Sequence, residues 1–272
     1  MPVNGTTEVY GILGNPVGHS LSPAMQNAAF RHLGLNKVYV PFPALDAGAA
    51  IAGFKALGVR GVSVTIPHKQ AVIPFLDAID PVAAKIGAVN TLVVNGGQVS
   101  GFNTDWLGAN AALKELTSLA GRRVLILGAG GSARAIGFGL LEEGAELTLA
   151  SRTPASGQAL AQALGCPWLP LDDAAGAAAD ILINATSVGM GKDAAMSPMP
   201  KAALANFGLV MDIVYAPLET TLLREARAAG CQTINGLAML LYQGVAQFER
   251  WTGLNAPVAI MRQELLAGMA RR

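Results

Sequence analysis

The sequence is poor in cysteine, in charge and in long apolar runs, and each shortage excludes a class of protein. Its two cysteines, Cys166 and Cys231, have no second Cys or His at metal-ligand spacing, so we expect neither a disulfide framework nor a zinc or other metal site. The net charge is +1, with Lys and Arg scattered along the chain. No basic field is therefore available to bind nucleic acid or anionic lipid.

Signals for export or membrane insertion are also lacking. Mean hydropathy is positive, yet no apolar run reaches the roughly 18 to 20 residues of a spanning helix. The stretch from Met1 to Tyr10 has no basic segment followed by an apolar one, so we expect no secretory signal and a cytoplasmic location. Hydrophobic residues make up 52% of the 272 and charged residues 14%, which indicates extensive burial, in two modules or one large α/β unit.

The first third of the chain alternates short apolar runs with helical spacing. Residues 23–33 and 47–57 have the apolar spacing of helices, with Ser22 and Asp46 available as N-caps. This alternation predicts a parallel α/β sheet. Its candidate strands are residues 9–13, 37–42, 61–66 and 91–95.

A second alternation begins near residue 123 and predicts a second α/β unit. A helix predicted over residues 104–119 and a return crossing near Asn235 and Gly236 would make this unit an insertion in the first. From Leu237 onward the sequence looks wholly helical. The elements predicted inside the insertion are strands at residues 123–127, 146–150, 181–184 and 209–212 and a helix at residues 133–143.

A glycine-rich turn follows the strand at residues 123–127 and precedes a helix, which is the context that a dinucleotide-binding motif requires. Gly128 allows the tight turn, Gly130 removes a Cβ from the path of a pyrophosphate, and Ala133 permits close helix packing. The alternative is a tight βα turn without a ligand. A strand ending about 20 residues later, at the expected ribose position, favours the cofactor.

Ser151, Arg152 and Thr153 stand at that ribose position, where an NAD enzyme usually has Asp or Glu. The Arg152 guanidinium and the two hydroxyls suit a 2′-phosphate, so we expect NADP rather than NAD. The alternative is an exposed arginine that simply follows a strand.

Lys69 and Asp105 are the candidates for acid/base chemistry, because each follows a predicted strand, at the edge where parallel sheets bind ligands. Their alternatives are a solvated loop lysine and a helix N-cap. We expect the neighbouring His68 to point away from Lys69 in an extended segment and to be structural. Ser20, Ser22 and Asn90 follow or precede other strands and could bind a polyhydroxylated ring or its carboxylate, with capping or turn closure as the alternative.

Several segments together resemble the shikimate dehydrogenase family. The resemblance covers nearly the whole chain, in family order. It is carried by Gly14-Asn-Pro-Val-Gly-His-Ser-Leu-Ser-Pro23, Val64-Thr-Ile-Pro-His-Lys69, Ile86-Gly-Ala-Val-Asn-Thr91, Asn103-Thr-Asp105, Asn184-Ala-Thr-Ser-Val-Gly-Met190, Asp212-Ile-Val-Tyr215-Ala-Pro217 and Asn235-Gly-Leu-Ala-Met239, with Gln243.

The resemblance implies a soluble enzyme that interconverts shikimate and 3-dehydroshikimate with NADP, in a cleft between two α/β domains. Residues 1–106 with 237–272 would form the substrate domain, and residues 107–236 an inserted Rossmann-type NADP domain. Lys69 and Asp105 would be the acid/base pair. The remaining substrate contacts would be Ser20, Ser22, Thr65, Asn90, Tyr215 and Gln243. The cofactor contacts would be Gly128, Ala129, Gly130, Gly131, Ser132, Ser151, Arg152, Thr153, Ile213 and Gly236.

Two departures from the family pattern concern the cofactor and one helix. Ser151 and Ser156 stand where the family has Asn and a second Arg, so one basic contact is missing and some NAD use is conceivable. Gln26 stands where the family usually has His, and we expect it on a helix outside the chemistry. The alternatives that remain are a quinate/shikimate dehydrogenase with relaxed NAD or NADP use and a catalytically silent ligand sensor. We expect a small-molecule substrate, no nucleic acid, no membrane, and allow for a homodimer.

Overall fold

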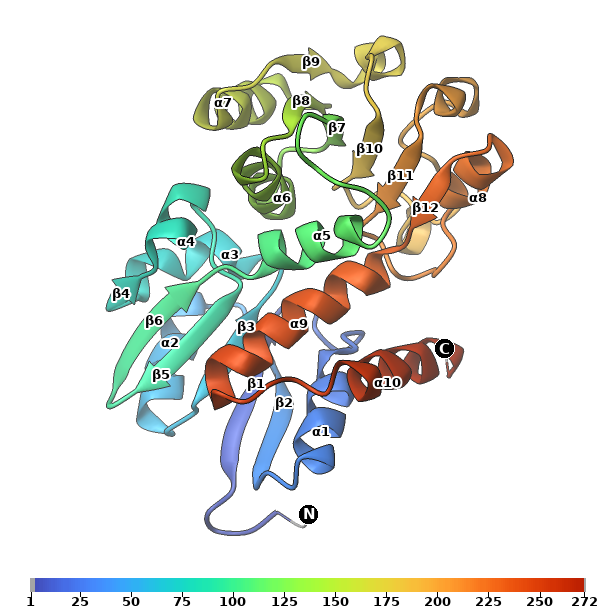
Figure 1. Ribbon diagram of the computed structural model, residues 1–272. Coiled ribbons are helices and arrows are strands. Elements are labelled where there is room, and N and C mark those ends of the chain that lie inside the picture. Colours follow the sequence, from blue (N-terminus) through green and yellow to red (C-terminus); the bar gives the residue numbers. More distant parts are fainter. Residues whose placement is uncertain (1–2, 272) are drawn as a thin grey trace. The chain divides into compact units, whose positions relative to one another are not determined.

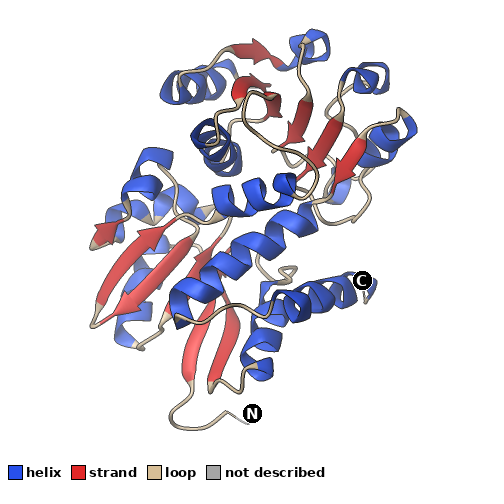
Figure 2. Ribbon diagram, in the orientation of Figure 1, coloured by secondary structure: helices blue, strands red, loops and turns tan. Residues whose placement is uncertain are grey.

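The structure, a computed structural model, describes residues 3–271 and divides into two compact units. The first unit runs to Thr104 and resumes at Gln243, and the second spans Asp105–Tyr242. Each unit has one six-stranded sheet with helices packed on it (Figures 1 and 2).

The first sheet is mixed rather than parallel, which corrects the prediction. Its order is β2-β1-β3-β5-β6-β4, and β5 alone runs against the other strands. The expectation failed because the residue pattern of a buried apolar strand does not reveal the direction of that strand in the sheet. The strands are β1 (Glu8–Gly14), β2 (Lys37–Pro43), β3 (Gly61–Val64), β4 (Ala78–Ile79), β5 (Thr91–Asn95) and β6 (Gln98–Phe102).

A two-residue turn reverses the chain between β5 and β6. Gly96 and Gly97 have φ values of 57° and 77°, in the left-handed region that hairpin turns of this length require. Asn95 pairs with Gln98 across the turn. The hairpin returns the chain to the edge of the sheet at which β5 began.

The helices of the first unit tie its two chain segments together. On α9, Trp251 lies against Gly61, where an added Cβ would be 2.5 Å from the indole nitrogen, and that nitrogen donates to the Leu92 carbonyl at 3.0 Å. Helix α10 packs against α1 (Figure 1). The helices are α1 (Ser22–His32), α2 (Ala47–Ala56), α3 (His68–Ala71), α4 (Pro81–Ile86), the later part of α9 (Gly236–Thr252) and α10 (Val258–Ala270), with a 3₁₀ turn at Ile73–Phe75.

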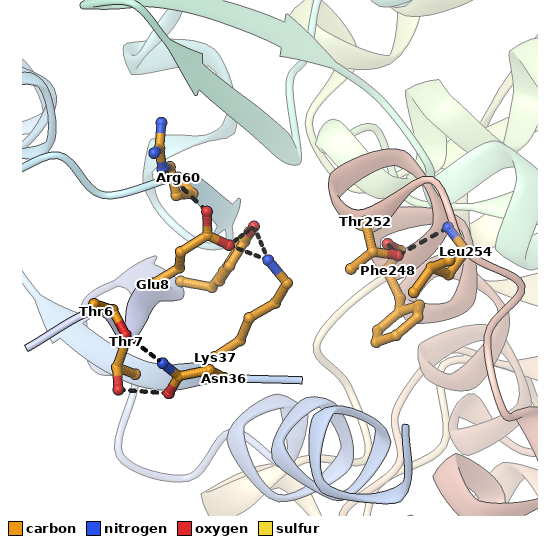
Figure 3. A network of polar contacts seen from close by, with 10 residues as sticks. Thr6, Thr7, Glu8, Asn36, Lys37, Arg60, Phe248, Thr252 and Leu254 are labelled. Atoms are coloured by element: carbon orange, nitrogen blue, oxygen red, sulfur yellow. Dashed lines mark hydrogen bonds and ion pairs between the residues drawn. The ribbon is translucent and has the colours of Figure 1, made fainter. Parts of the chain in front are cut away.

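Polar contacts hold the edge strand β2 against β1, and others lie at the C-terminal end of α9 (Figure 3). Lys37 of β2 forms an ion pair with Glu8 of β1, and Arg60 lies 3.5 Å from the same carboxylate. At the end of α9, the Thr252 hydroxyl donates to the Phe248 carbonyl at 2.8 Å and accepts from the Leu254 amide at 3.2 Å. The chain from Leu237 is almost wholly helical, as expected, and its two helices are separated at Gly253 (φ 68°) and Pro257.

The second sheet is entirely parallel, in the order β12-β11-β10-β7-β8-β9. This is the doubly wound order in which the first strand, here β7, is central and the chain switches direction between β7 and β10. The strands are β7 (Arg123–Leu127), β8 (Glu146–Ser151), β9 (Trp168–Pro170), β10 (Ile181–Asn184), β11 (Leu209–Asp212) and β12 (Gln232–Ile234). The helices are α5 (Asp105–Lys114), α6 (Gly131–Glu142), α7 (Pro154–Leu164), α8 (Thr221–Ala228) and the beginning of α9, with 3₁₀ turns at Leu171–Gly176, Gly191–Asp193 and Lys201–Asn206.

The chain passes between the two units twice. The first crossing lies between Thr104 and Asp105, and the return crossing lies within α9, between Tyr242 and Gln243. Met239 and Tyr242 pack with the core of the second unit, which explains why the early turns of α9 belong there. The helix predicted over residues 104–119 ends at Lys114, where the chain turns.

Strands predicted at residues 91–95, 123–127, 181–184 and 209–212 are confirmed to the residue. Asp46 is confirmed as an N-cap, because its side chain accepts from the Ala49 amide at 3.0 Å. Within residues 3–271, no helix has the length and apolar character needed to cross a bilayer.

Candidate active site

The polar residues expected to bind substrate follow strand ends that lie at one edge of the first sheet. Leu13 is in register with Val64 across β1 and β3, and Thr91 is in register with both Ser63 and Phe102 across β3, β5 and β6. The carboxyl ends of β1, β3 and β6 therefore meet the start of β5, at the edge where open α/β sheets bind ligands. Just beyond these ends come Ser20, Ser22, Thr65, Lys69, Asn90 and Asp105.

Asn90, just before β5, is hydrogen-bonded to the chain just after β6. Its Oδ1 accepts from the Thr104 amide and from the Thr91 hydroxyl, both at 2.7 Å. Its Nδ2 donates to Thr104 Oγ1 at 3.0 Å and to Gln243 Oε1 at 3.5 Å. Asn90 thus brings two of the predicted substrate residues together, itself and Gln243, and it fixes the backbone immediately before the buried Asp105.

Lys69 lies close to this cluster through its backbone. The Val89 amide donates to the Lys69 carbonyl at 2.7 Å, one residue before Asn90. The segment is the short helix α3, which corrects the expectation of an extended chain. His68 is buried, and its Nε2 lies 2.7 Å from the Ala44 carbonyl, which confirms its structural reading. The Lys69 side chain is half-buried.

Ser22 is not the N-cap of α1, because the helix begins at Ser22 itself and the cap position is Leu21. The Ser22 amide instead donates to Ser20 Oγ at 3.2 Å, so the two predicted hydroxyl contacts share one turn. One turn later, the fully buried Gln26 donates from Nε2 to the Gly244 carbonyl at 2.9 Å. Gln26 therefore links α1 to the residue next to Gln243.

A buried chain of hydrogen bonds that sequence reasoning missed lies behind these residues. The Tyr39 hydroxyl donates to Ser63 at 2.6 Å, Ser63 donates to Gln247 Oε1 at 2.7 Å, and Gln247 Nε2 donates to the Asn90 carbonyl at 3.0 Å. Ser22 is a further hydrogen-bond partner of Tyr39, whose pKa is raised by burial. Gln247 could have been found, because it lies one helical turn after Gln243 and so faces the same side.

The glycine-rich turn of the second unit has the geometry that a pyrophosphate requires. Gly128 has a φ of 113°, and a Cβ there would lie 3.0 Å from the Ala185 carbonyl oxygen, so the turn abuts the chain after β10 at the switch point. A Cβ on Gly130 would meet no described heavy atom within 4 Å. Gly130 is the N-cap of α6 and has no side chain with which to cap the helix. The positive end of its dipole is thus directed to the place where an anion would bind.

The residues at the end of β8 divide into one buried and two exposed side chains. Ser151 is buried, and its hydroxyl donates to the Thr153 carbonyl at 3.1 Å and accepts from Trp168 Nε1 at 3.0 Å. Arg152 and Thr153 are exposed. The Ser151 hydroxyl therefore shapes the turn that presents Arg152, and its proton is already used within the chain.

Ile213 and Gly236, which the family resemblance places near the nicotinamide, lie against each other. A Cβ on Gly236 would be 2.2 Å from the Ile213 carbonyl oxygen, and the Gly236 amide donates to the Val214 carbonyl at 3.3 Å. Tyr215, two residues after Ile213, is half-buried. Only a glycine at position 236 allows this approach.

The two cysteines and the described metal-ligand residue types do not indicate thiol or metal chemistry. Cys231 is buried, and burial raises the pKa of the half-buried Cys166 to about 11, so this thiol is protonated at neutral pH. Among the residues that the structure describes, no group of three His, Cys, Asp or Glu side chains could hold a metal ion.

Three family models match successive parts of the chain: the shikimate dehydrogenase substrate binding domain at residues 12–92, shikimate / quinate 5-dehydrogenase at residues 110–213, and the shikimate 5′-dehydrogenase C-terminal domain at residues 236–266. The shikimate dehydrogenase (NADP(+)) of Haloarcula marismortui is 51% identical, with 95% of this chain and 98% of that one covered. That of Methanothermobacter thermautotrophicus is 48% identical, with 97% of each chain covered. A crystal structure of Thermus thermophilus shikimate 5-dehydrogenase with NADP(H) and shikimate has a TM-score of 0.90 at 40% identity, covering 96% of this chain and 99% of that one. The chain therefore belongs to the shikimate dehydrogenase family.

Proposed function

We propose that this protein catalyses the reversible NADPH-linked reduction of 3-dehydroshikimate to shikimate, a step toward chorismate and the aromatic amino acids. The observation that carries the proposal is the edge of the first sheet, where the Asn90 side chain is hydrogen-bonded to Thr91, Thr104 and Gln243 and the Lys69 backbone lies beside them. Relatives that match almost the full chain are named shikimate dehydrogenase (NADP(+)), which supports the same reaction.

The first unit provides most of the substrate contacts in this proposal, and Asp105 and Tyr215 belong to the second unit. A ring with several hydroxyls and a carboxylate needs many short polar contacts of fixed direction. Asn90 and Gln243 are already held together, and the paired hydroxyls of Ser20 and Ser22 share one turn. Thr65 follows β3, and Tyr215 belongs to the loop after β11. Shikimate would bind to Ser20, Ser22, Thr65, Asn90, Asp105, Tyr215 and Gln243.

The second unit provides the cofactor contacts. The turn after β7 and the start of α6, whose N-cap is a glycine, fit a pyrophosphate, and the exposed Arg152 with Thr153 fits a 2′-phosphate. NADP, when bound, supplies or accepts the hydride. Gly128, Ala129, Gly130, Gly131 and Ser132 would hold the pyrophosphate. Arg152 and Thr153 would hold the adenosine phosphate on the turn that Ser151 shapes, and Ile213 and Gly236 would lie near the nicotinamide.

Lys69 would transfer the proton, and Asp105 would orient the groups between which the proton moves. In the direction of shikimate formation, Lys69 donates a proton to the forming ring alkoxide, and in reverse it removes the ring hydroxyl proton. Asp105 orients the substrate and the lysine. The Asn90 bonds to Thr104 keep the backbone at the start of α5 in one position, so the carboxylate is presented in one geometry.

The test is absorbance at the reduced-nicotinamide band with purified protein, comparing shikimate and quinate, each with NADP⁺ and with NAD⁺. We expect rapid reduction of NADP⁺ with shikimate and much slower reduction in the other three mixtures. Comparable rates with quinate or NAD⁺ would identify a broader dehydrogenase. If no cofactor is reduced in any of the four mixtures although the protein still binds shikimate, the protein is a ligand sensor.

We further propose that the protein acts in the cytoplasm on small molecules alone and that a homodimer is its assembled form. Light scattering coupled to size-exclusion chromatography gives the mass in solution. A mass of one chain at micromolar concentration would rule out the dimer, and fractionation of the source cells would test the location.

A further inference from the structure

A fully buried carboxylate lies at the end of β11 in the second unit, in a place that the proposed chemistry does not use. Asp212 has no exposed surface. Its Oδ1 accepts from Asn184 Nδ2 at 2.9 Å and from the Val214 amide at 3.0 Å, and its Oδ2 accepts from the Thr220 hydroxyl at 2.7 Å. The donors come from the end of β10, from the loop after β11 and from the N-cap of α8.

Asn184 extends the same network into the loop after β10. Its Oδ1 accepts from the Thr186 amide at 3.0 Å and from the Thr186 hydroxyl at 2.7 Å, and its Nδ2 also donates to the Val188 carbonyl at 3.1 Å. The Asn184 carbonyl accepts from the Ile213 amide at 3.1 Å. Asn184 and Asp212 therefore hold two loops, one after each of two adjacent strands.

The loop after β11 carries Ile213 and Tyr215, and it lies directly against Gly236. Two of these residues are proposed to lie near the nicotinamide and the third to contact substrate. A loop that carries groups from both sides of a hydride transfer has to be held to within a fraction of an ångström, because small misplacements cost large factors in rate.

We propose that Asp212, in its ionised form, is a positioning residue that fixes the loop after β11 for hydride transfer. This inference rests on the proposed function. The carboxylate accepts three bonds from neutral donors, and bonds to an ionised acceptor are shorter and roughly twice as strong as neutral ones. Protonation or replacement by an amide leaves a neutral side chain of the same shape, which holds the Val214 amide more weakly.

The groups that act on the Asp212 carboxyl are uncharged. Burial raises its pKa to about 6, and the bonds from Thr220, Val214 and Asn184 lower it. The charged residue nearest to Asp212 in the sequence is Glu219, which precedes the N-cap of α8, is exposed and pairs with Arg227. The ionised form therefore predominates at neutral pH and is lost below about pH 6.

The principal test compares Asp212→Asn with Asp180→Asn. Asp180 precedes β10, at the opposite end of the sheet, where it pairs with Arg123 at 2.6 Å on the surface, and it serves as the control. We expect Asp212→Asn to lower kcat about tenfold, the ratio of a charge-assisted to a neutral bond, with little change in KM. In the variant the acid limb near pH 6 disappears, whereas Asp180→Asn keeps the wild-type profile.

A second pair of variants uses Thr220. Because its hydroxyl lowers the Asp212 pKa, Thr220→Val should move the acid limb to higher pH, and Thr220→Ser, which retains the hydroxyl, should restore it. Thr220 also caps α8, so both variants are compared for folding by circular dichroism.

Amide exchange provides a readout that requires no turnover. The Val214 and Ile213 amides should exchange faster in Asp212→Asn than in Asp180→Asn at the same pH. An active wild type with an unchanged rate, profile and exchange in Asp212→Asn would overturn the positioning role while leaving the proposed function intact. An inactive wild type would refute the proposed function, and exchange would then decide whether Asp212 holds the loop.

Discussion

Single side chains in the first unit act mainly through what they hold in place. Asn90 contacts Thr91, Thr104 and Gln243 with one amide group. The Ser151 hydroxyl performs a similar task in the second unit, where it links Thr153 to a tryptophan. Lys69 and Arg152 lie on segments that hydrogen bonds of this kind hold in place.

Replacing Lys69 by Ala should lower kcat by about 10² to 10⁴, the usual contribution of a positioned acid or base. Substrate affinity should change little, because the lysine acts on the proton rather than on the ring as a whole. Steady-state kinetics with calorimetric binding of shikimate separates the two. Lys85→Ala, an exposed lysine of the same unit, is the control. Equal losses in turnover and binding would contradict the assignment.

Replacing Arg152 by Ala should weaken NADP⁺ binding about 10- to 100-fold, which corresponds to the loss of one or two charge-assisted hydrogen bonds. NAD⁺ has no 2′-phosphate, so its affinity should stay nearly the same. Calorimetric titration with the two oxidised cofactors measures the ratio. The exposed Arg122, at the opposite end of the same sheet, provides the control variant. A parallel loss for both cofactors would exclude the phosphate contact.

At the scale of elements, the sequence predicted buried strands well and strand direction poorly. Strands β7, β10 and β11 are continuous apolar runs, and their bounds follow from burial alone. Strand β6 has a small or polar residue at most positions and was missed, and with it the reversal of β5. Lys69 and Asn90 were found, because polar residues beside apolar runs are visible in the sequence, and Asp105 was found from its place just before a helix. Tyr39, Ser63 and Asp212 were not assigned roles, since only tertiary contacts distinguish them from ordinary core or strand residues.

The start of α6 yields a prediction that separates folding from binding. Gly130 is extended (φ −84°, ψ −175°), and an added Cβ would meet no described heavy atom within 4 Å, so Gly130→Ala should change the melting temperature by only about a degree or two. The methyl group would occupy the path of the pyrophosphate and should weaken NADP⁺ binding about tenfold or more.

Gly11→Ala is the matched control for Gly130→Ala. Its Cβ would lie 2.4 Å from the Val40 carbonyl oxygen of the neighbouring strand in the first unit, so this variant should lose stability without touching the cofactor turn. Thermal unfolding and cofactor titration of both variants test the contrast. A stable Gly130→Ala protein with unchanged NADP⁺ affinity would show that the turn does not hold the phosphates.

At the scale of the whole molecule, stability and activity should respond to acid in opposite directions. Asp212 has a folded-state pKa of about 6, raised above the ordinary 3.8 by burial. The folded protein therefore binds this proton more tightly than the unfolded chain does. The associated stabilisation is present below about pH 4 and is lost as the pH rises to about 6, a change of about 3 kcal/mol from a shift of roughly two pKa units.

Urea unfolding of wild type and Asp212→Asn across pH 4 to 7 measures this effect, since the amide does not titrate. We expect the variant to match the wild type near pH 4 and to exceed it in stability at pH 7. The pH dependence of stability from Asp180 has the opposite sign. Its ion pair with Arg123 lowers its pKa to about 2, so the stabilisation by Asp180 is lost on acidification. A wild type that gains stability relative to Asp212→Asn as the pH rises would contradict the sign.

The hairpin of β5 and β6 has a practical consequence. Its turn at Gly96 and Gly97 is exposed and lies at the end of the sheet opposite Asn90 and Asp105. Exposed loop tips with small residues accept inserted sequence better than any element they join. A short peptide tag or a fluorophore attachment site placed between the two glycines would label the substrate unit without touching the edge that binds the ring, and would leave both chain ends unmodified.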